Sequence, residues 1–194
     1  MPFSESSLEQ ALKALGELLD SRGLEYRLAA VGGGAMLLLG LLDRPTNDLD
    51  VVTQADESGA AVSADPLASP LREAITDVAR AFDLPEDWLN PGPAALLELG
   101  LPPGFADRAH VRRYGALEIR LADRVDQIHF KLYASVDQGP ESKHFADLEA
   151  LEPTREELLA AARWARTHDP SDGFRAGLEA ALEALGVRAT DEQL

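Results

Sequence analysis

Two carboxylates stand one residue apart in Asp48-Leu49-Asp50, just before Val51 and Val52. Alternate side chains of a strand share a face, so Leu49 can enter a core while both aspartates project on the other side. Like charges about 7 Å apart by strand geometry repel each other unless a cation lies between them. The pair therefore suits Mg²⁺ or Mn²⁺ bound together with substrate phosphates, although it equally fits a solvent-facing strand edge.

Three consecutive glycines, Gly32, Gly33 and Gly34, stand ahead of the apolar run 35–39. Glycines before a helix indicate a turn at which the backbone approaches another group closely. The backbone N–H groups that open the helix would suit a phosphate. A turn that only lets a strand and a helix pack tightly has the same sequence, so both interpretations stay open.

The elements expected to carry these motifs follow from periodicity and end signals. Ser6 and Glu9 have the spacing of a capping box, which predicts a helix over 6–22 that ends before Gly23. A strand follows over 24–31, and residues 53–69 read as a loop. A helix over 69–82 would bury one face that includes Phe82, and Trp88 is expected in the core. A short helix is expected at 93–99.

Alternating apolar residues predict strands at 108–113 and 116–121. Asp123 can cap a helix with Lys131 on a stripe next to its buried face. The following helix would leave Lys143 and Asp147 exposed, where they could form a surface pair. A helical pair is expected at 154–167 and 172–185.

Composition limits the possible classes of protein. The chain has 194 residues, 45% of them hydrophobic, which fits a globular fold. It has no cysteine, which excludes disulfides, thiolate zinc sites and cysteine nucleophiles. No apolar run is long enough for a bilayer, so the expected location is the cytoplasm and no membrane partner is expected.

Charge argues against non-specific nucleic-acid binding, because the net charge is −16. A local basic surplus nevertheless lies between Arg108 and Lys131, and it could be a partner surface or a pair of solvated strand faces.

The order of strand, glycine turn, short helix and Asp-x-Asp resembles the signature of the nucleotidyltransferase superfamily, whose fold is shared with DNA polymerase β. The segment Arg44-Pro45-Thr46-Asn47-Asp48-Leu49-Asp50 resembles the AbiEii-like nucleotidyltransferase toxins and their uncharacterised bacterial relatives. Lys131-Leu-Tyr-Ala and the run 143–151 extend the resemblance over residues 24–151. The third glycine departs from the commoner Gly-Ser pair and removes a hydroxyl that would contact phosphate.

The resemblance implies an α/β (α+β) fold, in which helices flank a small mixed sheet and the C-terminal part is helical. We expect a nucleotidyltransferase-like domain over 1–151 and a helical pair over 152–194 packed on the same core. The implied reaction moves a nucleotidyl group from an NTP to an acceptor hydroxyl. The implied acceptor is RNA such as tRNA, and the implied protein partner is a cognate antitoxin.

Residue roles follow from the same resemblance. Asp48 and Asp50 would bind the metal, with Glu118 as a third carboxylate unless it is an exposed strand glutamate. Asp147 would act as catalytic acid or base. The groups expected to bind the nucleotide are Gly32, Gly33, Gly34, Arg44, Thr46 and Lys131. Arg44 could equally well only anchor its loop. The surface expected to dock RNA is formed by Arg112, Arg113 and Arg120.

Two other functions share this sequence evidence. A non-catalytic protein could keep the fold and bind or regulate a partner. A small-molecule nucleotidyltransferase would use the same site and differ only in its acceptor.

Overall fold

The computed structural model describes residues 2–56 and 58–190, which form two compact units with a boundary between residues 122 and 123. The predicted domain division at residue 151 falls inside the second unit.

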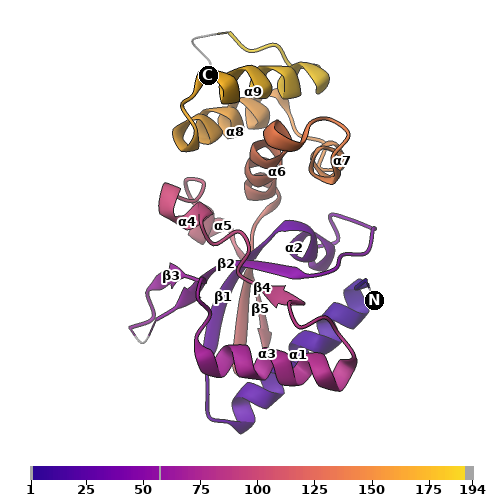
Figure 1. The fold of residues 1–194 in the computed structure, drawn as a ribbon, viewed down its shortest axis with the longest axis vertical. Helices are drawn as coiled ribbons and strands as arrows, with labels where there is room; N and C mark the ends of the chain where they lie inside the picture. The colour runs from indigo at the N-terminus through magenta and orange to yellow at the C-terminus, as the bar shows by residue number, and fades with distance from the viewer. Residues whose placement is uncertain (1, 57, 191–194) are drawn as a thin grey trace. The chain divides into compact units, whose positions relative to one another are not determined.

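The first unit contains a mixed six-stranded sheet (Figure 1). Its strands run in the order β3-β2-β1-β6-β5, and a short strand β4 pairs with β2. The β1–β6 and β2–β4 pairs are parallel, and the other pairs are antiparallel. This confirms the expected mixed sheet. The strand bounds are β1 (Tyr26–Val31), β2 (Leu49–Ala55), β3 (Ala61–Ser63), β4 (Leu89–Asn90), β5 (His110–Tyr114) and β6 (Leu117–Leu121).

The main core lies between one face of this sheet and the helices α1 (Glu5–Ser21) and α3 (Ser69–Phe82). Trp88 is fully buried there, as predicted, and its indole Nε1 donates a hydrogen bond to the Ile75 carbonyl over 3.1 Å. The prediction for Phe82 was wrong, because its side chain is 45% exposed. The helix ends at this residue, and Asp83 turns the chain away with a φ of 53°.

Helix α1 begins one residue earlier than the sequence suggested, at Glu5. The capping box joins Ser4 and Ser7, so the predicted box at Ser6 and Glu9 was wrong. Glu9 instead accepts a 2.8 Å hydrogen bond from the Tyr114 hydroxyl. Burial and the Glu9 carboxylate together raise the pKa of Tyr114, so the phenol stays protonated and joins α1 to β5.

Three short helices complete the first unit: α2 (Gly32–Leu38), α4 (Leu96–Leu99) and α5 (Phe105–Arg108). The segment predicted as a loop over 53–69 contains the end of β2 and the strand β3, which the sequence analysis missed. Gln54 holds this segment, because its amide Nε2 donates to the carbonyls of Ser63 and Pro66.

The second unit is helical, as expected, and consists of α6 (Arg124–Gln138), α7 (Lys143–Ala150), α8 (Arg155–His168) and α9 (Asp172–Ala184). Asp123 caps α6 by accepting the Val125 N–H, as predicted. The Arg124 guanidinium joins the elements by donating to the Leu151 carbonyl and to Glu157. No helix in the described part of the chain has both the length and the apolar character needed to cross a membrane.

Candidate functional site

The glycine turn lies directly against strand β2, which carries Asp50. Helix α2 follows β1 without a loop, so Gly32 is its first residue and has a φ of +74°, which glycine adopts at low cost. A Cβ atom added at Gly32 would lie 2.8 Å from Oδ2 of Asp50. The Asp50 carboxylate therefore occupies the space that a side chain at Gly32 would fill.

The next two glycines face other parts of the segment 44–50. A Cβ at Gly33 would lie 3.0 Å from the Thr46 hydroxyl oxygen and 3.8 Å from Nη2 of Arg44. A Cβ at Gly34 would lie 2.6 Å from the main-chain oxygen of Asp48. Tight strand–helix packing is thus sufficient to explain Gly34. Gly32 and Gly33, in contrast, adjoin the polar ends of three side chains predicted to bind metal and phosphate.

The predicted alternation around the aspartates is confirmed. Leu49 and Val51 are fully buried, whereas Asp48 and Asp50 are half-buried. Thr46 is buried, and its hydroxyl donates a 3.3 Å hydrogen bond to the main-chain oxygen of Asp48. This bond fixes the loop that leads into β2. The predicted contact of this hydroxyl with phosphate or a metal-bound water stays a prediction.

Asn90 is a candidate site residue that the sequence analysis missed. It lies opposite Asp50 in the parallel β2–β4 pair, and its Oδ1 accepts the Gly92 N–H over 2.8 Å. A Cβ at Gly92 would lie 2.8 Å from Asn90 Oδ1 and 3.7 Å from Asp50 Oδ1. The turn signal Asn90-Pro91-Gly92 is visible in the sequence, but its pairing with a strand 40 residues earlier is not.

Glu118 does not join the aspartates. It pairs with Arg27 in the β1–β6 register, whereas Asp50 pairs with Val31, four residues further along β1. That offset is about 13 Å along the strand. We therefore leave Glu118 out of the proposed metal site, as a correction to the sequence-based role.

Glu118 instead forms ion pairs with three arginines, Arg27, Arg113 and Arg120. Burial raises the pKa of Glu118, but the hydrogen bonds from Arg120 and Arg113 outweigh this effect and lower it overall. Its carboxylate therefore stays charged and holds three strands together.

The predicted RNA-docking arginines lie on different sides of the sheet. Arg113 pairs with Glu118, while Arg112 pairs with the buried Ile119 and donates to the Leu38 carbonyl over 3.4 Å. Neighbouring residues of a strand point to opposite faces, so Arg112 cannot share a surface with Arg113 and Arg120.

The oxygen atoms of the candidate site in the first unit are of the kind that bind a hard cation such as Mg²⁺. No group of three or more His, Asp or Glu residues that could hold a metal ion occurs within residues 2–56 and 58–190. Two carboxylates suffice for Mg²⁺ when substrate phosphates supply further oxygens, and an amide oxygen such as that of Asn90 is also a suitable donor. Asp48 and Asp50 are therefore the residues that would hold it.

Lys131 and Asp147 lie in the second unit and form an ion pair with each other. The Lys131 Nζ and Asp147 Oδ2 atoms are 2.7 Å apart, and the side chains are only 5% and 2% exposed. The expectation of an exposed Asp147 beside Lys143 was therefore wrong, because α6 and α7 pack with Asp147 facing α6. The roles that the resemblance implies for Lys131 in nucleotide binding and for Asp147 as acid or base stay predictions.

Comparisons with known proteins add one likeness. No family model matches the sequence, and no curated protein matches it. The structure is similar to the crystal structure of an antigenic nucleotidyltransferase-like protein from Paracoccidioides brasiliensis, at 18% sequence identity and a TM-score of 0.48. The match covers 93% of this chain and 95% of that chain. A likeness of this size carries no inference about function.

Proposed function

We propose that this protein is a metal-dependent nucleotidyltransferase of the AbiEii-like kind. Asp48 and Asp50 hold Mg²⁺ or Mn²⁺, and the glycine turn with Arg44 and Thr46 binds the phosphates of an NTP. The observation that carries the proposal is the close approach of Gly32 and Gly33 to Asp50, Thr46 and Arg44. It supports one compact site in which a phosphate could meet both a cation and an arginine.

The reaction joins an acceptor hydroxyl oxygen to the α-phosphorus of the NTP and breaks the bond from that phosphorus to the β-phosphate oxygen. Pyrophosphate leaves, and the hydroxyl proton passes to a general base, a role that the sequence resemblance assigns to Asp147. The bound cation supplies charge neutralisation at the phosphate oxygens. Arg44 adds a bidentate donor for phosphate. The contact between Lys131 and the triphosphate rests on the sequence resemblance alone.

We extend the proposal to an RNA acceptor such as tRNA and to a cytoplasmic toxin–antitoxin pair. The support for RNA is the basic surplus of β5 and β6, with Arg112 left out because it faces away from Arg113 and Arg120. The proposal of an antitoxin partner rests on the sequence resemblance alone.

The test uses radiolabelled NTPs, Mg²⁺ and total tRNA, with the wild-type chain beside Asp50→Asn and Asp48→Ala. We expect label on RNA with the wild type and none with either variant. A matched control is Asp43→Asn, which removes one exposed carboxylate from the loop ahead of the site. Label transfer that survives Asp50→Asn would overturn the assignment.

One observation favours a second function. Lys131 and Asp147 neutralise each other in a buried pair, as in a structural contact. A non-catalytic partner-binding protein would keep such a pair without using it. Calorimetry separates the two functions, because only the enzyme requires Mg²⁺-dependent NTP binding that Asp50→Asn abolishes. An enzyme that binds NTP but labels only small hydroxyl compounds would be a small-molecule nucleotidyltransferase.

A further inference from the structure

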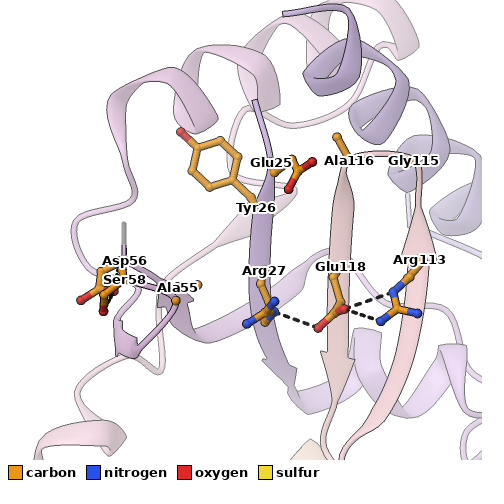
Figure 2. A pocket seen from close by; sticks show the side chains of 11 residues that line it. Glu25, Tyr26, Arg27, Ala55, Asp56, Ser58, Arg113, Gly115, Ala116 and Glu118 are labelled. Carbon is orange, nitrogen blue, oxygen red and sulfur yellow. Dashed lines mark hydrogen bonds and ion pairs between the residues drawn. The ribbon is translucent and has the colours of Figure 1, made fainter. Parts of the chain in front are cut away.

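The sheet of the first unit carries a second cluster of charge, at the opposite end of β1 from Asp50. Arg27, Glu118 and Arg113 form a row across β1, β6 and β5, which Figure 2 shows from close by. Arg120 lies two residues beyond Glu118 on β6 and therefore on the same face. We call Arg27, Arg113 and Arg120 the arginine triad.

One carboxylate holds the whole triad in place. Oε1 of Glu118 accepts from Nε of Arg27 and from Nε of Arg120, both over 3.0 Å. Oε2 accepts from Nε and Nη2 of Arg113 over 3.2 and 3.0 Å. Glu118 is thus the hub of the cluster and uses both of its oxygens on guanidinium groups.

This arrangement leaves donors available on the outside. A guanidinium has five N–H donors, and the contacts of Arg27 and Arg120 with Glu118 are made by Nε. The side chains of Arg27, Arg113 and Arg120 are 46%, 76% and 37% exposed, whereas that of Glu118 is 14% exposed. The carboxylate is therefore covered, and terminal guanidinium nitrogens face solvent.

The charges of the cluster are unbalanced. Three guanidinium groups meet one carboxylate, in a chain whose net charge is −16. Like charges held this close repel each other, so an anion bound to the outer nitrogens would lower the electrostatic energy. Arginine forks match phosphate oxygens in geometry as well as in charge.

A hollow with a volume of about 490 Å³ has Arg27 and Arg113 of the triad in its wall and gives an anion room to enter, whereas Arg120 lies in the wall of a different hollow. The wall of the first hollow includes Arg27, Arg113 and Glu118, and also the acidic Asp56 and Glu25. The Asp56 carboxylate is used in its own turn, where it accepts from the Ser58 N–H and hydroxyl and from the Ala60 N–H.

We propose that the arginine triad, held by Glu118, is a binding subsite for a phosphate group. The phosphate can belong to a nucleic-acid strand or can be a free phosphate, and the chemistry of recognition is the same. Glu118 acts as the positioning residue. The proposal needs no metal and no catalysis, so it stands or falls separately from the nucleotidyltransferase assignment.

The experiment measures binding of a labelled single-stranded RNA oligonucleotide to the full chain, without NTP or metal, over a range of salt concentrations. The test variant carries Arg27→Gln, Arg113→Gln and Arg120→Gln. The control variant carries the same change at three exposed arginines elsewhere, Arg72, Arg80 and Arg188, so both variants have the same net charge. Circular dichroism confirms that each variant is folded.

We expect the triad variant to bind RNA at least about tenfold more weakly, while the control binds nearly as the wild type does. Removing the partner of one phosphate should flatten the slope of log K against log salt by about 0.7. The single variant Arg113→Gln, at the most exposed position, tests the same effect with the least risk to folding. Equal weakening in the triad and control variants would overturn the proposal.

Inorganic phosphate as competitor distinguishes the sources. Phosphate that displaces RNA from the wild type, and fails to affect the residual binding of the triad variant, indicates a subsite for free phosphate. RNA binding that depends on the triad but resists phosphate indicates a strand. Absence of wild-type binding to both probes would refute the subsite. Asp50→Asn should retain binding in every arm, whatever its effect on label transfer.

Discussion

The buried ion pair between Lys131 and Asp147 makes a quantitative prediction. At 2.7 Å and with side chains 5% and 2% exposed, neither charge has water as an alternative partner. Removing one partner leaves the other charge buried, which costs about 3–5 kcal/mol. We therefore expect Lys131→Met and Asp147→Leu each to destabilise the second unit by that amount.

The double variant should behave differently from the sum of its parts. Apolar residues of similar volume at both positions leave no buried charge, and such replacements are often neutral or stabilising. We expect the double variant Lys131→Met with Asp147→Leu to recover most of the free energy of unfolding that each single variant loses. In a double-mutant cycle this gives a coupling energy of about 3 kcal/mol or more. Lys143→Met is the matched control, because Lys143 is exposed on α7.

Urea unfolding followed by tryptophan fluorescence provides the assay. The chain has two tryptophans, and Trp164 lies in the second unit, with its ring centroid 4.1 Å from that of His168. A Trp88→Phe background leaves Trp164 as the only tryptophan. Single variants that cost less than about 1 kcal/mol, or effects that simply add in the double variant, would refute the buried-pair reasoning.

Three further predictions concern the first unit. Gly32→Ala should cost about 1–2 kcal/mol in backbone strain and also displace the Asp50 carboxylate. Gly40→Ala has the same left-handed strain with no atom within 4 Å, so calorimetry should show weakened Mg²⁺-dependent NTP binding for Gly32→Ala only. Because the folded-state pKa of Glu118 is lowered, its stabilising effect is full above about pH 4.3 and is lost as the pH falls through the folded value. Glu118→Gln should therefore flatten the acid limb of the stability curve, and exposed Glu86→Gln should not. The third prediction tests which residues lie near the bound metal. Fe²⁺ bound in place of Mg²⁺, with peroxide and ascorbate, should cleave the protein backbone near residues 32–34, 48–50 and Asn90. Asp50→Asn should abolish this cleavage. A pattern without the Asn90 cut would remove this residue from the site.

Local signals were sufficient for much of the fold. The alternation of Leu117, Ile119 and Leu121 predicted β6. The helix expected from residue 154 is α8, which Thr154 and Glu157 cap. These signals succeed because a cap or a two-residue period involves neighbours in the chain. They fail at helix ends where several nearby residues could each act as the cap. At α1, Ser4 is the cap and Ser6 is not.

The sequence by itself predicted that Asp48 and Asp50 share a face, and it determined that the three glycines allow a close approach. Only the tertiary structure decided what meets them. Strand pairing brings Asn90 beside Asp50 and keeps Glu118 away, and helix packing buries Asp147 against Lys131. These contacts join residues far apart in the chain, so their partners depend on register and burial, which spacing along the sequence does not encode.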